Sequence, residues 1–241
     1  MDKQRYLVRP RRDSKYMTIN VHEHADIDAI NFLPSGVEVR GYQNYDIQTN
    51  SIQFIEKDSH SWTDTQQKVK MLEVILAKNK CHSYLDFGSN LGVLVFKACM
   101  QNVRSCGIDY NNDYIVICNK ISKYLNFQNT NFYTDTFSFF NTCDEWDLIS
   151  LMNIHHHLYG RTDIPMSLQT INETVLKKCK WFLTQFPTEL DIKAKKWTTL
   201  FKGIGPYNRE AFISSLDGRE CIILYESDGR PIFLIRGDVP I

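Results

Sequence analysis

The sequence has few of the features that define membrane, secreted or disulfide-bonded proteins. No apolar run approaches the roughly 20 residues that a membrane span needs, and the start MDKQRYLVRP lacks the apolar core of a signal peptide. The seven cysteines are odd in number and contain no C-x-x-C pair, which argues against a disulfide framework and a zinc knuckle. These absences favour a protein without a membrane span whose thiols stay reduced, and they predict a cytoplasmic location.

An excess of charge of one sign is also missing, because 28 Lys and Arg balance 28 Asp and Glu. The chain as a whole therefore offers no field that recruits nucleic acid or an anionic membrane, and any such binding must be local. Residues 1–16 are the exception, with six basic and two acidic side chains. Two interpretations of this segment stay open, a solvated terminus and a patch for a phosphate-bearing substrate.

What the sequence does contain is material for a core. Of the 241 residues, 43% are hydrophobic and 12% aromatic, which is enough for one large or two small domains. Residues 17–58 are polar and hold only short β-like pieces such as VEVRGY and SIQFIE. We therefore predict an N-terminal appendage over 1–60, acting as a substrate or lid segment, and a larger domain over 61–241.

The larger domain shows apolar strand-like runs that alternate with helical periodicity. Strands are predicted at 83–88, 105–110, 130–135, 146–153 and 181–186, and helices at 64–78, 91–101, 112–124 and 164–178. Thr63 and Gln66 have the spacing of a capping box for the helix over 64–78. The tail ECIILYESDGRPIFLIRG reads as an antiparallel hairpin. This order predicts an α/β fold, a Rossmann-like seven-stranded sheet that is mostly parallel, with a C-terminal antiparallel hairpin and helices on both faces.

The stretch LDFGSNLG places Asp86, Gly88 and Gly92 between the first of these strands and the next helix. Ligands bind at this edge of a doubly wound sheet, although an ordinary tight turn would have the same pattern. Asp109 ends the second strand, 23 positions after Asp86, where such sheets hold the carboxylate that accepts from ribose hydroxyls. The carboxylate pair Asp86 and Asp109 suits a ribose better than a pyrophosphate. In addition, Asn90 stands where a dinucleotide loop usually has glycine, which leaves less open backbone for a pyrophosphate.

On these motifs the segment from about 64 to 241 resembles a class I S-adenosylmethionine-dependent methyltransferase. LDFGSNLG is similar to the glycine-rich first motif of that family, GIDY to its acidic second-strand end, and FYTD to its third-strand end. WDLISLMNIHHHL is similar to its fourth strand and the loop that follows. The resemblance covers about three-quarters of the chain, and it depends on the order of the motifs more than on any one of them.

The resemblance implies S-adenosylmethionine as cofactor and a role for each motif. Gly88 and Gly92 would pass beside the methionine part, and Asp86 would orient their loop or meet the amino group. Asp109 would hold the ribose hydroxyls. The remaining predicted cofactor residues are Ser89 and Asn90 in the loop, Tyr110 beside the adenine, Asp135 at the adenine amino group, Thr136 next to it in the chain, Asn153 near the sulfonium, and Gln66 before the first strand.

Three consecutive histidines, His155, His156 and His157, follow the fourth strand. They cannot all face one way, so at most two line one site. A neutral imidazole suits removal of a proton from a hydroxyl that accepts a methyl group. We predict His156 or His157 as the base and a structural role for His155, and a purely structural role for all three stays open. A divalent metal held by His155 or His157 with Asp163 or Asp135 is a further alternative, with His157 and Asp163 as the named candidates.

Three functions compete at this point. The motifs are similar to glycan-modifying O-methyltransferases, so the first is methylation of a sugar hydroxyl or a terminal phosphate of a glycan. The second is an RNA or small-molecule methyltransferase. Nucleic acid is not favoured, because the net charge is zero and the lysine-aspartate-lysine-glutamate set of cap ribose methyltransferases is absent. The third is a non-catalytic binding module that has kept the fold.

Overall fold

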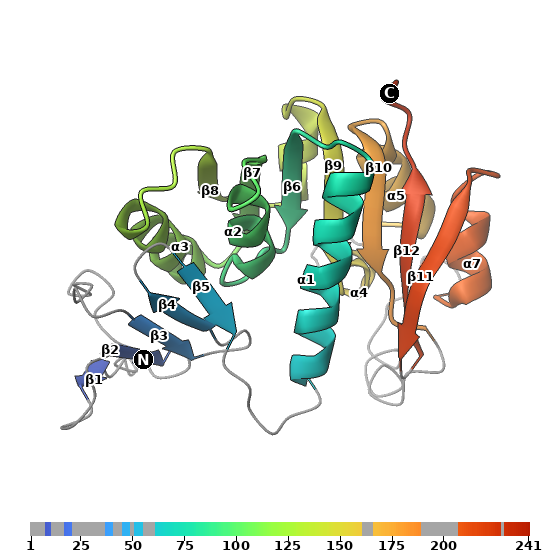
Figure 1. Cartoon of the computed structure of the whole chain (residues 1–241). Coiled ribbons are helices and arrows are strands. Elements are labelled where there is room, and N and C mark those ends of the chain that lie inside the picture. The colour runs from blue at the N-terminus through green and yellow to red at the C-terminus, as the bar shows by residue number, and fades with distance from the viewer. Residues whose placement is uncertain are drawn as a thin grey trace. The chain divides into compact units, whose positions relative to one another are not determined.

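The computed structural model describes residues 8–10, 17–20, 37–40, 45–48, 51–54, 61–160, 166–188, 207–227 and 229–241 (Figure 1). The chain divides into two compact units. The first contains residues 1–80 and 89–134, and the second contains residues 81–88 and 135–241. The boundary at residue 60 predicted from the sequence stays a prediction.

The N-terminal part of the first unit is a five-stranded sheet of short strands. Its strands follow the order of the chain: β1 (Val8–Pro10), β2 (Met17–Asn20), β3 (Val37–Arg40), β4 (Tyr45–Gln48) and β5 (Ser51–Phe54). Neighbouring strands are antiparallel except β2 and β3, which are parallel. VEVRGY and SIQFIE therefore contribute β3 and β5, and the sheet has more strands than these two pieces indicated.

The rest of the first unit alternates helices with two parallel strands. Its elements are α1 (Ser61–Lys78), α2 (Val93–Cys99), β7 (Arg104–Asp109), α3 (Asn112–Tyr124) and β8 (Thr130–Thr134). The capping box predicted at Thr63 is wrong, because α1 already begins at Ser61. α3 has the predicted bounds, and its N-terminus is capped by the Asn111 side chain, which accepts from the backbone N–H of Asp113.

The second unit contributes the other five strands of the larger sheet. Its elements are β6 (Ser83–Phe87), the 3-10 helix η2 (Phe137–Asn141), β9 (Trp146–Met152), α4 (His155–Gly160), α5 (Leu168–Leu176), β10 (Cys179–Gln185), α7 (Arg209–Ser214), β11 (Cys221–Ser227) and β12 (Arg230–Arg236). α5 packs against β10 and α7. Residues 164 and 165, the start of the helix predicted at 164–178, lie outside the described residues.

The larger sheet has seven strands in the order β11-β12-β10-β9-β6-β7-β8. β6, β9 and β10 are parallel, as are β7 and β8, whereas β12 is antiparallel to both β10 and β11. The predicted Rossmann-like sheet with an antiparallel C-terminal hairpin is therefore confirmed. The carboxyl ends of the parallel strands are where this architecture places its ligands.

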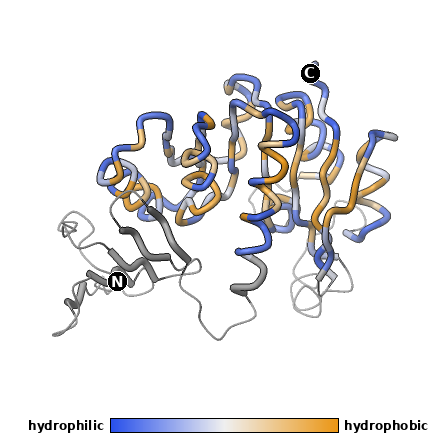
Figure 2. Tube along the Cα trace, in the orientation of Figure 1, coloured by the Kyte–Doolittle hydropathy of each residue, from blue (hydrophilic) through white to orange (hydrophobic). Residues whose placement is uncertain are grey.

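The core of the sheet comes from strands that are apolar on both faces. Leu148, Ile149 and Leu151 of β9 are completely buried, and so are Phe182 and Leu183 of β10. Figure 2 shows this as hydrophobic colour along the strands of the second unit. Continuous burial of this kind is expected for parallel strands covered by helices. No helix among the described residues is long and apolar enough to cross a membrane.

Candidate functional site

Two glycines shape the loop between β6 and α2. Gly88 has φ of +80° and Gly92 has φ of +75°, a left-handed conformation that favours glycine. A Cβ at Gly88 would overlap the side chain of Ile154, and one at Gly92 would lie 2.7 Å from the Phe132 ring. The predicted motif is therefore needed both for its backbone angles and for close packing, whether or not it touches a ligand.

Asp109, at the end of β7, is held in place by backbone amides. It is 7% exposed, and its carboxylate accepts two backbone N–H bonds, from Asn90 and Asn111, each 2.9 Å long. Burial raises the pKa of this carboxyl, while the backbone hydrogen bonds act to lower it. Each carboxylate oxygen has a second lone pair, so the group retains acceptor sites for a pair of hydroxyls.

Asn90 explains how the loop works without the glycine that this position commonly has. Its φ is +51°, which asparagine tolerates better than most residues. Its N–H donates to Asp109, and its side-chain oxygen accepts from the N–H of Leu91. The asparagine therefore satisfies the loop backbone and orients the carboxylate.

Tyr114 is a neighbour of this carboxylate that the sequence reasoning missed. Burial and the charge of Asp109 raise the pKa of Tyr114, and a hydrogen bond from the Asn90 side chain lowers it. An aromatic hydroxyl in the first turn after the acidic strand end was the available signal. Tyr110 is 82% exposed beside Asp109. Gln66 lies half-buried on α1 of the same unit.

Ser89 is completely buried, unlike a side chain that lines an open site. Its N–H donates to the carbonyl of Ile108, and its own carbonyl accepts from Gly92. These bonds tie the loop to β7. Ser89 therefore contributes through its backbone, and contact between its hydroxyl and a cofactor stays a prediction.

Asp86 lies 2% exposed near the end of β6 in the second unit. It accepts a short hydrogen bond from the Ser150 hydroxyl, which in turn lies 2.7 Å from the Tyr84 hydroxyl. Burial and the nearby Asp86 charge raise the pKa of Tyr84 well above its usual value. The carboxylate thus fixes β6 against β9, and its contact with the loop or with the cofactor's amino group stays a prediction.

Asp135 and Thr136 begin the segment that leads into η2. An Asp135 oxygen accepts from the N–H of Thr136 at 2.6 Å and from the hydroxyl of Ser138. The carboxylate therefore stabilises the first turn of η2. Its other oxygen is the acceptor that remains for the predicted adenine amino group.

Asn153 follows β9 in a left-handed conformation, with φ of +60°. Its N–H donates to the backbone carbonyl of Gln185, and its Nδ2 donates to Gln185 Oε1 at 2.7 Å. Gln185 is 1% exposed at the end of β10. The buried Oδ1 of Asn153 has no hydrogen-bond partner in the described part of the chain. Burying an acceptor without a partner costs about 1–3 kcal/mol of folding free energy. Asn153 Oδ1 has this cost at the carboxyl end of a strand, where this architecture places its ligands.

His155 is completely buried at the start of α4. Its Nε2 lies 2.9 Å from Asn172 Oδ1, and its Nδ1 lies 3.3 Å from the Thr184 hydroxyl. The Asn172 amide donates to Ser215, which leaves its oxygen to accept from His155 and sets the Nε2–H tautomer. Burial lowers the pKa of His155 to about 4. This geometry favours the structural role predicted for His155.

The other two histidines differ in exposure. His156 is 3% exposed and His157 is exposed, with their ring centroids 4.0 Å apart. Asp163, the other half of the metal alternative, lies outside the described residues, and within those residues no three His, Cys, Asp or Glu side chains come together as a metal site. The metal and the choice of base both stay predictions.

Comparison with known proteins supplies the fold. No family model and no curated protein sequence matches this chain. Among solved structures, the bifunctional kinase-methyltransferase WbdD superposes with a TM-score of 0.58 at 14% identity, over 75% of this chain and 40% of WbdD. Magnesium protoporphyrin IX methyltransferase (ChlM) from Synechocystis PCC 6803 gives a TM-score of 0.56 at 14% identity, over 76% and 90%. The chain has the class I S-adenosylmethionine-dependent methyltransferase fold.

Two of the solved structures with this fold contain bound SAH. The N-terminal domain of EvdMO1 with SAH bound superposes with a TM-score of 0.58 at 10% identity, over 77% of this chain and 87% of that domain. The ChlM structure also contains SAH. The chain spans about 40% of the length of WbdD, so what the whole of WbdD does is not carried over with the fold.

Proposed function

We propose that this chain is an S-adenosylmethionine-dependent O-methyltransferase that methylates a sugar hydroxyl or a terminal phosphate of a glycan. The observation that carries the cofactor assignment is the Asp109 carboxylate, which two backbone amides hold at a strand end of a methyltransferase fold. A carboxylate fixed in this way suits the two ribose hydroxyls, because both are hydrogen-bond donors. Asn90, Tyr110 and Tyr114 would surround the same part of the cofactor.

The class of molecule that accepts the methyl group is inferred from the end of β9. Asn153 Nδ2 donates to Gln185, so the Oδ1 of the same amide, which is buried in this structure, is left as a hydrogen-bond acceptor. An amide oxygen accepts a hydrogen bond from a neutral hydroxyl. It repels an ionised carboxylate or phosphate oxygen, because both atoms are acceptors. Within the proposal this favours the sugar hydroxyl over the phosphate. The WbdD similarity supports the methyltransferase fold, and the choice of a glycan comes from the motifs in the sequence.

In the proposed mechanism, most of the rate comes from positioning. S-adenosylmethionine supplies an electrophilic methyl group when bound. Asn153 Oδ1 would accept from a neighbouring hydroxyl of the same sugar, which would hold the attacking oxygen in line with the methyl carbon and raise the rate by several orders of magnitude. His156 or His157 would take the proton that the attacking hydroxyl loses. Asp163 and His157 remain the candidates for a metal that would bind adjacent hydroxyls.

The first experiment is transfer of labelled methyl from S-adenosylmethionine into host extract separated into carbohydrate, RNA, protein and small-molecule fractions, with and without EDTA. Label in carbohydrate that resists nuclease and protease supports the proposal, and its loss with EDTA supports the metal. Label in another fraction contradicts the glycan acceptor and keeps the cofactor. No label combined with no saturable SAH binding contradicts the enzyme assignment and favours a binding module.

Single variants then test the base. His156→Gln and His157→Gln should leave SAH affinity nearly intact, and one of them should lower turnover by about 10²-fold or more. If both variants turn over like the parent protein, the base lies elsewhere or none is needed. Asn153→Leu, of similar size, should also lower turnover, because it removes the acceptor oxygen while SAH still binds through Asp109.

A further inference from the structure

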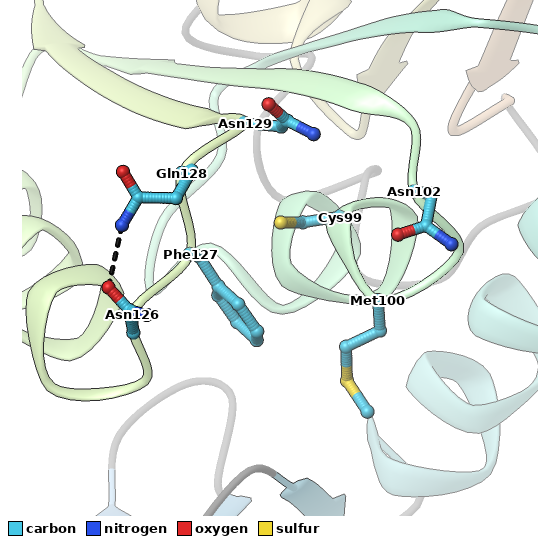
Figure 3. Close-up of a pocket in the computed structure, with 7 residues that line it drawn as sticks. All are labelled: Cys99, Met100, Asn102, Asn126, Phe127, Gln128 and Asn129. Carbon is cyan, nitrogen blue, oxygen red and sulfur yellow. Dashed lines mark hydrogen bonds between the residues drawn. The ribbon is translucent and has the colours of Figure 1, made fainter.

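A hollow lies in the first unit, beside the first residues of β7 and β8. It is therefore at the other end of β7 from Asp109. Its volume is about 310 Å³. It is lined by the last turn of α2, the turn after α2 and the loop between α3 and β8 (Figure 3). This size is near the lower end for small-ligand sites and would hold roughly one ring. We call this hollow the amide pocket.

The lining of the amide pocket has an unusual chemistry. Four of its seven side chains are carboxamides, those of Asn102, Asn126, Gln128 and Asn129, and none carries a charge. Each carboxamide offers two donors and an acceptor. Figure 3 shows the Phe127 ring and the Met100 thioether on one side of the hollow and carboxamides around the remaining rim.

Some of these amides are required by the fold, and others are not. Asn102 and Asn126 have φ of +62° and +54°, so both satisfy left-handed turns. Gln128 and Asn129 are exposed and have no such backbone requirement. Gln128 Nε2 donates to Asn126 Oδ1 at 2.6 Å, which orients two amide groups together at the rim. The fold therefore leaves the choice of amides at 128 and 129 unexplained.

We propose that the amide pocket binds a neutral sugar ring. Sugar hydroxyls donate and accept hydrogen bonds, as carboxamides do, so the two match without any charge. The apolar face of a sugar ring has partners in Phe127 and in Met100, which is 40% exposed. An anionic ligand would require basic side chains or helix N-terminal amides, and the lining offers neither.

A nucleic acid would fit the same pocket less well. Single-stranded nucleic acids are held by basic grooves and by aromatic faces on which bases stack. None of the seven described lining residues is a lysine or arginine, and the Phe127 ring is half-buried against Phe96, with centroids 6.0 Å apart. We therefore assign the sugar and make the nucleoside a result that would contradict the assignment.

The binding does not depend on methyl transfer, because Asp109 and the amide pocket are at opposite ends of β7. If the proposed glycan acceptor is correct, the pocket would hold a second sugar unit of the same glycan. If the acceptor is something else, the pocket still binds sugar. The assay therefore measures binding alone, while methyl transfer is measured separately as above.

The test is saturation-transfer NMR on the full chain with methyl α-D-glucopyranoside, methyl α-D-galactopyranoside and methyl α-D-mannopyranoside. At least one should bind saturably with a dissociation constant on the order of 1 mM, which is typical for one small ring in a shallow site. D-Glucuronate and the nucleosides adenosine and uridine should bind more weakly. No saturable glycoside, or tighter binding of a nucleoside, overturns the proposal.

Variants locate the binding. The double variant Gln128→Ala with Asn129→Ala should weaken glycoside binding by about tenfold or more, the effect of losing hydrogen bonds to a neutral ligand. Both side chains are exposed, so the fold should survive, which thermal unfolding checks. The matched control is Gln101→Ala, an exposed amide next to the pocket that does not line it. Equal affinity in the double variant and the control overturns the assignment of the pocket.

Discussion

The candidate residues around Asp109 in the first unit and those around the end of β9 in the second unit are built in different ways. Around Asp109 the hydrogen bonds to the carboxylate come from backbone amides of Asn90 and Asn111. Around the end of β9 the polar groups are side chains bonded to other side chains, as in Asn153 with Gln185 and His155 with Asn172. A backbone site depends on loop conformation, whereas a side-chain site depends on residue identity and on protonation. The predictions below separate these two dependences.

The largest effect is expected at His155. Its pKa is about 4 in the folded protein and about 6.5 when unfolded, so the unfolded chain binds the extra proton between these values. Stability is therefore full above about pH 6.5 and falls as the pH decreases toward 4, by roughly 2 kcal/mol at about pH 5. Urea unfolding at both ends of this range measures the loss.

His155→Gln is the variant that isolates this dependence. It removes the titrating ring, so most of the loss between about pH 7 and about pH 5 should disappear. Asp109 works in the opposite sense, because burial raises its pKa and protonation at low pH relieves the cost. If the variant keeps the full pH dependence of the parent protein, His155 is not the group responsible.

Gly92→Ala tests the backbone site by packing. The new Cβ would lie 2.7 Å from the Phe132 ring and 3.0 Å from Cys118 Sγ, at φ of +75°. We expect a loss of about 1–3 kcal/mol in the free energy of unfolding. Gly218→Ala is the control, since Gly218 has φ of +73° and open space. Equal losses in the two variants would show that backbone strain alone matters.

Asp109→Ala tests the same site by charge and acceptor capacity. The SAH dissociation constant should rise by about tenfold or more, because a hydrogen bond to a charged group is worth about 1.5–3 kcal/mol. Isothermal titration with SAH measures it. Asp113→Asn, which also removes a carboxylate near the start of α3, serves as the control. Unchanged affinity in Asp109→Ala would refute the assignment of Asp109 to the ribose.

The smallest effect is expected for Asn90→Gly. Glycine accepts the left-handed φ of +51° and keeps the N–H that donates to Asp109. The lost bond to the Leu91 N–H and the greater freedom of glycine should cost about 1 kcal/mol or less. SAH affinity should change by less than about threefold. A large loss of affinity would show that the Asn90 side chain contacts the cofactor directly.

Much of the fold could be predicted because its signals are local. The alternation of apolar runs with helical periodicity gave α3 with its observed bounds and placed the strands within a few residues. The strands of the N-terminal sheet were harder, because runs of three or four residues carry little periodicity. The start of α1 was missed for a related reason, since a Thr and a Gln at capping-box spacing also occur inside helices.

The candidate site divides along the same line. Asp86, Gly88, Gly92 and Asp109 were predicted because their motifs are adjacent to strand ends. Tyr114 and Gln185 were not, because their importance arises from contacts with Asn90 and Asn153, which are 24 and 32 positions away. The short windows in which helical or strand periodicity is recognised do not include both members of either pair. The amide pocket was missed for the same reason, as its residues come from two separate turns.

The sequence by itself determined the order of strands and helices, the left-handed glycines and the acid at the end of β7, because these follow from local sterics and from apolar periodicity. Only the tertiary structure decided that Asn153 Oδ1 is buried without a partner in the described part of the chain and that His155 is the histidine buried in a polar network. It also decided where four amides surround one hollow. Those properties depend on burial and on distances between segments far apart in the chain, which a linear pattern does not contain.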